Sequence, residues 1–151
     1  MTRPAARRSP AGPRAFGALL LALLLLLAGA PASAQAPRPA RDTTLHSAEQ
    51  GARAWLAHLD AGAYERAWSD VVAAMRGSTT YAEWTTSLDQ LRSVLPHGPG
   101  RTLLRAEHGV PLFGGDSVLL TFAVRGTGLR EIVVLVRDRT RWRVGGYGIL
   151  L

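Results

Sequence analysis

The sequence has 151 residues, a formal net charge of +7 at pH 7 and no cysteine, which excludes a fold held together by disulfides. Four of the 18 basic residues and none of the 11 acidic ones lie in the first 34 residues. The rest of the chain therefore carries a formal charge of +3, and its length is that of one small domain.

The first 34 residues have the three parts of a secretory signal peptide. Four arginines form a positive segment, residues 16–30 are apolar, and residues 32–34 are small. The apolar run falls short of the roughly 20 residues that a membrane span needs. We expect cleavage between Ala34 and Gln35, a periplasmic or secreted product, and membrane contact during export only.

Residues 35–44 contain two prolines and no apolar period, which indicates a flexible leader before a single domain over residues 45–151. A capping-box pattern, Ser47 with Gln50, opens the first predicted helix, and Gly62 ends it. Its apolar residues Ala52, Trp55, Leu56 and Leu59 share one helical face. Apolar residues at helical spacing predict a second helix over residues 63–75. Thr80 and Glu83 open a third helix, which Pro96 terminates.

The second half alternates apolar and polar residues between turn-forming segments, which predicts four antiparallel strands. They cover about residues 102–108, 117–125, 129–137 and 142–149, and the third, apolar on both sides, should lie inside the sheet. The apolar residues in the two halves of the fourth strand alternate in opposite phases. A β-bulge at Gly145-Gly146, between the halves, would turn the apolar side chains of both towards the core. The predicted inward residues are Leu104, Ala106, Val118, Leu120, Phe122, Val124, Ile132, Val134, Trp142, Val144, His108 and Tyr147.

Helices followed by antiparallel strands predict an α+β domain, with three N-terminal helices packed on the concave face of a bent four-stranded sheet. The segments 54–56, 59–62, 67–68 and 142–147, together with Tyr64, Trp84, Leu88 and Arg92, resemble a bacterial exported family known as domain of unknown function 4019. The resemblance covers about residues 47–149. It implies a cone-shaped fold similar to nuclear transport factor 2 and the cystatin-like group, and it implies no activity.

The sequence contains no nucleophile elbow, no phosphate-binding loop and no histidine pair at metal-ligand spacing. We therefore expect no metal and no cofactor. Nucleic acid is an improbable partner for an exported chain without aromatics interleaved among its arginines.

Two groups of residues are candidates for binding. The first group could line an apolar pocket inside the cone and consists of Trp55, Trp68, Trp84, His108 and Tyr147. The alternative is that its aromatic residues belong to the core, as aromatics at helical spacing usually do. Arginines on the strand phase predicted to face away from the core could form a basic docking face, or only a solvated one: these are Arg101, Arg105, Arg125, Arg137, Arg141 and Arg143, with Glu107 and Glu131 among them.

Asp60 follows the first helix and could point to the mouth of the cone, or simply cap the next helix. The expected function is a non-catalytic module that binds an envelope protein or a second copy of itself. The alternatives are a binder of a small apolar ligand and an isomerase-like enzyme that uses Asp60, His108 or Tyr147.

Overall fold

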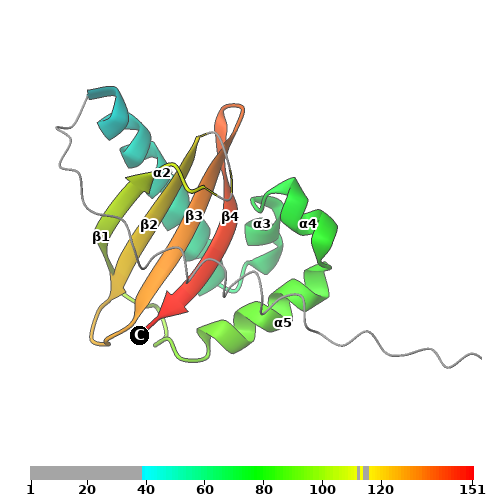
Figure 1. Ribbon diagram of the computed structural model, residues 1–151. Coiled ribbons are helices and arrows are strands. Elements are labelled where there is room, and N and C mark those ends of the chain that lie inside the picture. The colour runs from blue at the N-terminus through cyan, green and yellow to red at the C-terminus, as the bar shows by residue number, and fades with distance from the viewer. Residues whose placement is uncertain (1–38, 112, 114–115) are drawn as a thin grey trace, which may run out of the picture. The chain divides into compact units, whose positions relative to one another are not determined.

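The computed structural model describes residues 39–111, 113 and 116–151, and for residues 39–42 it describes the backbone alone. The predicted signal peptide, its cleavage point and residues 35–38 lie outside the described residues. The helices precede the strands as predicted (Figure 1). In the described part of the chain, no helix has the length and apolar character needed to cross a membrane.

The first described helix, α2 (Pro39–Asp60), begins earlier than predicted, so residues 39–44 of the predicted leader are helical. Proline is well suited to a first helical turn, because the N–H that it lacks would have no partner there. The predicted apolar face is confirmed, since Ala52, Trp55, Leu56 and Leu59 are all buried. Gly62 follows the helix with φ of +67°, a conformation that favours glycine.

The prediction of a single second helix over residues 63–75 is wrong. The structure has two short helices there, α3 (Tyr64–Ser69) and α4 (Ala73–Ser78). Between them, the backbone of Val71 bridges that of Val144 in the last strand, the N–H of Val72 donates to the carbonyl of Val144, and the N–H of Val144 donates to the carbonyl of Asp70. Pairing with the edge of the sheet therefore interrupts the helix, although the apolar spacing continues through it.

The last helix, α5 (Tyr81–Arg92), starts with the predicted capping box. The Thr80 side chain accepts from the N–H of Glu83, and the Glu83 carboxylate accepts from the N–H of Thr80. The helix ends at Arg92, before Pro96, and a loop over residues 93–100 leads to the sheet. The described residues thus form four helices where three were expected.

The four strands β1 (Arg101–His108), β2 (Ser117–Val124), β3 (Arg130–Asp138) and β4 (Arg141–Leu150) form one antiparallel sheet in sequence order. The prediction that the third strand lies inside the sheet is confirmed. A register shift opposite Val134 and Leu135 leaves Gly145 as an extra residue, so the predicted bulge is confirmed as well. It allows both Val144 and Tyr147 to pack on the core.

The predicted inward phase is wrong in two strands. In β3, Val133 and Leu135 join the core that the helices cover, whereas the predicted Ile132 and Val134 alternate with them on the other face. A strand that is apolar on both sides shows no alternation, so only its register with β2 selects the phase. In β1, a second, unpredicted bulge at Leu104 leaves that side chain 53% exposed.

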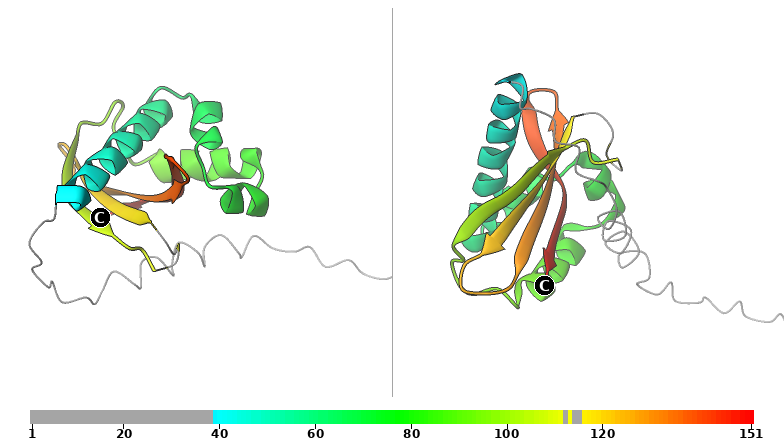
Figure 2. Two further views of the ribbon diagram at one scale, coloured as in Figure 1. Left: turned by 90° about the horizontal axis from the view of Figure 1, so that it is seen from above. Right: turned by 60° about the vertical axis from the view of Figure 1, so that its left-hand side comes forward.

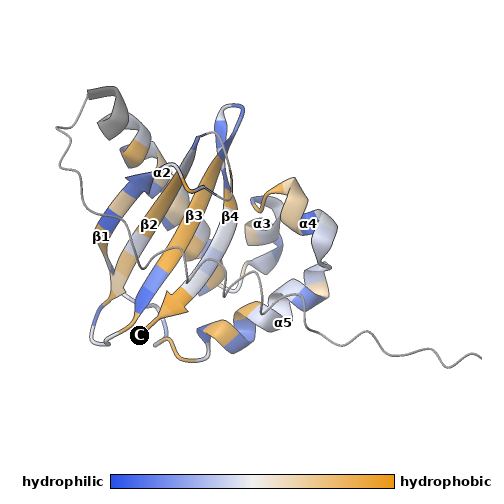
Figure 3. Cartoon of the chain, in the orientation of Figure 1, coloured by the Kyte–Doolittle hydropathy of each residue, from blue (hydrophilic) through white to orange (hydrophobic). Residues whose placement is uncertain are grey.

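The core lies between α2 and one face of the sheet, and α2 contacts all four strands (Figure 2). Apolar residues are concentrated along the central strands β2 and β3 (Figure 3). Phe122 and Leu120 of β2 are fully buried there beside Leu56 of α2. The fold is therefore α+β, with an open sheet covered by helices on one face.

Candidate functional site

A charged network lies where the C-terminal ends of α2 and α5 meet the sheet. Its centre is Glu131 of β3, which stands opposite the buried Phe122 of β2 and has no exposed surface. The Glu131 carboxylate accepts hydrogen bonds from Arg101 through both Nε and Nη2. It also accepts one from the Tyr147 hydroxyl at 2.5 Å, and Arg92 Nη1 approaches it at 3.5 Å.

Asp60, the last residue of α2, completes the network. Arg92 Nη2 donates to Asp60 Oδ1 at 2.5 Å, and Arg101 Nη1 and Nη2 donate to the two carboxylate oxygens at 2.5 and 2.9 Å. The two guanidinium groups therefore lie between two carboxylates, and the formal charges cancel. The side chains of Arg101 and Arg92 are only 8% and 12% exposed, so their desolvation is offset by this pairing.

The network holds its groups in their ordinary charge states. Burial alone would raise the pKa of Asp60, but hydrogen bonds from Arg101 and Arg92 outweigh burial and bring this pKa below its usual 3.8. Burial and the adjacent Glu131 carboxylate raise the pKa of the Tyr147 hydroxyl above its usual 10.0. At neutral pH, Asp60 is therefore ionised and Tyr147 is protonated.

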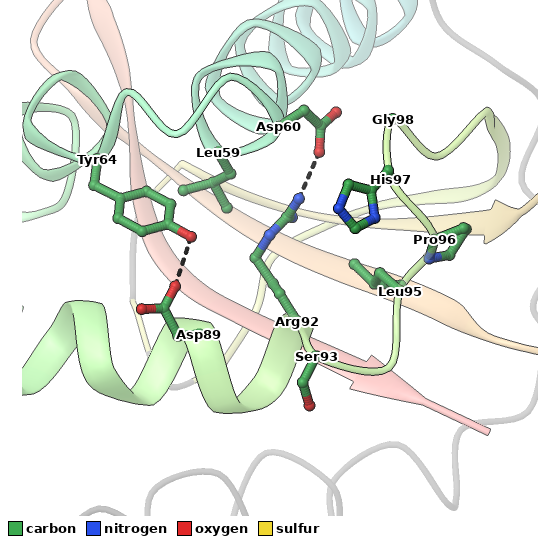
Figure 4. Close-up of a pocket in the computed structure, with 10 residues that line it drawn as sticks. All are labelled: Leu59, Asp60, Tyr64, Asp89, Arg92, Ser93, Leu95, Pro96, His97 and Gly98. Carbon is green, nitrogen blue, oxygen red and sulfur yellow. Dashed lines mark hydrogen bonds and ion pairs between the residues drawn. The ribbon is translucent and has the colours of Figure 1, made fainter.

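A pocket of about 280 Å³ opens beside this network, between the end of α2, α5 and the loop that follows α5 (Figure 4). It is lined by Leu59, Asp60, Tyr64, Asp89, Arg92, Ser93, Leu95, Pro96, His97 and Gly98. Gly98 has φ of +57°, which lets the loop turn back towards the sheet at this point.

Across the pocket from Asp60, the Tyr64 hydroxyl donates to Asp89 Oδ1 at 2.7 Å (Figure 4). This hydrogen bond to the carboxylate raises the pKa of Tyr64 above its usual 10.0. Within the described residues, Asp89 takes part in no ion pair. The pocket wall thus contains one carboxylate neutralised by arginine and one that no arginine neutralises.

The predicted ligand-binding residues are brought together only in part: the rings of Trp55 and Tyr147 meet edge to face in the core, with centroids 5.3 Å apart. Trp55 and Trp84 are buried in the core, and Trp55 donates through Nε1 to the carbonyl of Ala67 at 3.0 Å. Trp68 packs on Trp84 with ring centroids 5.1 Å apart. His108 is exposed at the end of β1, far along the strand from the network that contains Tyr147. Trp55 and Trp84 belong to the buried cluster between α2 and the sheet, and Trp68 and Tyr147 pack against it.

The prediction that the arginines and Glu131 share the outer face of the sheet is also corrected. Arg101 stands opposite the buried Val124 and turns inward to Glu131, because the bulge at Leu104 reverses the phase of the residues before it. Arg143 pairs with Asp70 at 2.8 Å, and Arg105 pairs with Glu107. Arg125, Arg137 and Arg141 are exposed.

Sequence reasoning names Asp60, Arg101 and Tyr147 in separate candidate groups, and it does not predict that they meet Arg92 and Glu131 in one network. Arg92 was noted only as part of the family resemblance, and Glu131 was assigned to the solvated face. The one available signal was the position of Glu131 beside the long apolar run of the third strand, where an acidic residue requires a partner when buried. Tyr64 is among the residues that carry the family resemblance, which assigns it no role, and Asp89 belongs to no recognisable motif.

Helices that precede an open antiparallel sheet, with a charge-balanced network and a pocket at one end, define a small α+β domain. The chain belongs to the DUF4019 family of proteins of unknown function, whose model matches residues 51–147. This match confirms the family resemblance noted in the sequence. No curated protein and no solved structure matches the chain. Among the described residues, no group of three or more histidine or acidic side chains is placed to hold a metal ion.

Proposed function

We propose that this chain is an exported, non-catalytic binding domain of the bacterial envelope, and that the pocket beside Asp60 is its recognition site. The observation that carries the proposal is the pocket itself, which is open to solvent and lies against a charge-balanced network of ion pairs. Groups held by mutual hydrogen bonds present a preorganised surface, which lowers the entropic cost of binding.

The charge states at the site favour binding over acid–base catalysis. A general base or acid works best when its pKa lies near the operating pH. Asp60 and Tyr147 are shifted away from neutrality in opposite directions, and His108 lies elsewhere. This supports the non-catalytic part of the proposal against an isomerase-like reaction.

The pocket is a better candidate than the two surfaces considered from the sequence. The aromatic residues that could line a cone interior belong to the buried core cluster or pack against it, which disfavours an apolar ligand inside a cone. Of the arginines predicted to form a basic docking face, Arg101 pairs with Glu131 in the network, and both Arg105 and Arg143 have acidic partners. This disfavours the basic face as a docking surface. We retain as part of the proposal a distant relation to the cone-shaped group of nuclear transport factor 2, supported by the order of the elements and the helix-covered sheet.

Native mass spectrometry of the protein purified through its own export route tests this proposal. We expect a chain that begins at Gln35 and carries an additional bound mass, either a small molecule or an envelope protein. The variant His97→Trp should lose that mass, because the larger side chain fills the pocket that His97 lines.

The matched control is His46→Trp, which places the same side chain at an exposed position near the start of α2. It should retain the bound mass. A bare chain in the wild-type spectrum, or equal retention by both variants, would overturn the pocket as the recognition site. An uncleaved chain that stays in the cytoplasm would overturn export.

A further inference from the structure

We propose that the pocket binds a primary alkylammonium group, with Asp89 as its counter-ion. This inference rests on the proposed function, because it assigns a ligand class to the same site. The geometry that motivates it is a short pocket with both polar and apolar walls and with one carboxylate that no basic side chain pairs with in the described structure.

The arginines of the site are already occupied. Arg101 uses Nε, Nη1 and Nη2 on Glu131 and Asp60, and Arg92 uses Nη1 and Nη2 on Asp60, Tyr147 and Glu131. An anionic ligand would have to displace Glu131, which is buried, or Asp60, which is partly exposed, and the displaced carboxylate would lose its arginine partners. The pocket is therefore poorly suited to a carboxylate or a phosphate.

Asp60 is paired with arginine, whereas the described partner of Asp89 is the neutral hydroxyl of Tyr64, which donates to Asp89 Oδ1. The second oxygen, Oδ2, has no hydrogen-bond partner among the described residues. An ammonium group is a compact donor of three hydrogen bonds and can satisfy such an oxygen. The positive charge of Arg92, which also lines the pocket, is balanced by Asp60 at 2.5 Å.

The remaining walls suit the alkyl part of the ligand. Leu59, Leu95 and Pro96 supply apolar surface, and the Tyr64 ring lies on the α3 side of the pocket (Figure 4). A volume of about 280 Å³ lies just below the range of pockets for drug-sized molecules. It fits a short alkylamine, free in solution or at the end of a lysine side chain.

The test is an NMR titration of the exported protein with n-butylamine, butan-1-ol and butyrate at constant ionic strength. We expect butylamine to shift the amide resonances of residues 64, 89 and 97–98 and to bind at least tenfold more tightly than butan-1-ol. Asp89→Asn should remove this tenfold preference. Asp116→Asn, which removes an exposed carboxylate in the β1–β2 connection at the other end of β1, should preserve it.

A second variant, Tyr64→Phe, removes the competing hydroxyl from Asp89 Oδ1 and should bind butylamine at least as tightly as the wild type. N-acetyl-lysine methylamide, used as a further probe, separates the two sources: tighter binding than butylamine indicates a lysine side chain, and equal or weaker binding indicates a free amine. Equal affinity for butylamine and butan-1-ol, tighter binding of butyrate, or an unchanged preference in Asp89→Asn would overturn the inference.

The failure of this inference and the failure of the proposed function are distinguishable. A bound mass that His97→Trp removes, combined with no preference for butylamine, would leave the pocket as a binding site with another ligand class. A protein without any bound mass in native spectra would refute the proposed function whatever the titration shows.

Discussion

Glu131 keeps its carboxylate in a position without exposed surface, and it does so because three side chains converge on it. Arg101 and Arg92 come from outside the central strands, and Tyr147 comes from the neighbouring strand β4. Burial of a charge is tolerated when partners satisfy it, and removal of one partner leaves an uncompensated charge. The network is therefore as important for folding as for the pocket beside it.

Glu131→Gln should lower the free energy of unfolding by about 3–5 kcal/mol, because Arg101 and Arg92 would lose a buried counter-charge. Urea denaturation at pH 7, followed by tryptophan fluorescence, measures this loss. The control is Glu49→Gln, which breaks a pair between exposed side chains one turn apart, Glu49 with Arg53, and should cost less than about 1 kcal/mol. Equal losses in the two variants would contradict the structural role of Glu131.

Asp60 should make the protein sensitive to acid. Its pKa in the folded protein lies below the usual 3.8, so its contribution to stability is fully present above about pH 4. As the pH falls from 3.8 to below the lowered pKa of the folded protein, Asp60 takes up a proton in the unfolded chain before it does so in the folded protein. The contribution of Asp60 to stability is lost over this pH range.

Asp60→Asn removes this titration, and the variant should lose less stability than the wild type between pH 5 and pH 2. Urea unfolding at a series of pH values provides the comparison. If the free energy of unfolding falls equally in the two proteins between pH 5 and pH 2, Asp60 does not contribute to the loss of stability in acid.

At the scale of the elements, the edge strand β4 shapes both the sheet and the helices. Its backbone at Val144 pairs with the chain between α3 and α4, and its extra residue Gly145 reverses the phase of the strand. The ring of Phe113 lies against Gly145 on the face of the sheet opposite α2. A side chain at this glycine would meet that ring directly.

Gly145→Ala should destabilise the protein by about 1–3 kcal/mol, as insertions into filled space usually do. A Cβ there would lie 2.7 Å from Phe113 Cε1 and 3.0 Å from Val136 Cγ2. In Gly148→Ala, the new Cβ has nothing within 4 Å, and the change in stability should stay below about 0.5 kcal/mol. Thermal unfolding followed by circular dichroism compares the two variants, and similar midpoints would argue against close packing at Gly145.

Most elements defined by local signals were predicted well, and elements defined by distant contacts were not. The exception among the local signals is the pattern of Ser47 with Gln50, which lies inside α2 and does not open it. The capping box at Thr80 and the glycine stop at Gly62 act within one turn of helix, so their effect is visible in the sequence. The break between α3 and α4 depends on Val144, which is remote along the chain. No periodicity within residues 63–75 carries that information.

At the scale of the whole molecule, the proposed export requires a cleavage point that only small residues fit. The double variant Ala32→Arg with Ala34→Arg should stay at the mass of the full-length precursor in the membrane fraction. The wild type, and the control Ala40→Arg downstream of the cleavage point, should appear outside the cytoplasm without residues 1–34. Intact-mass measurement of cell fractions checks this, and cleavage of the double variant after another residue would contradict the assigned site.

The sequence by itself determined the class of the fold, the order of its elements, the buried face of α2, the bulge at Gly145 and the family, because each depends on local pattern or composition. Only the tertiary structure decided the phase of β3, the bulge at Leu104 and the network of Asp60, Arg92, Arg101, Glu131 and Tyr147. These features arise from strand register and from contacts between residues up to 55 positions apart. A charged side chain has the same appearance in a sequence whether it faces water or a buried partner, and only the packing of the chain distinguishes the two.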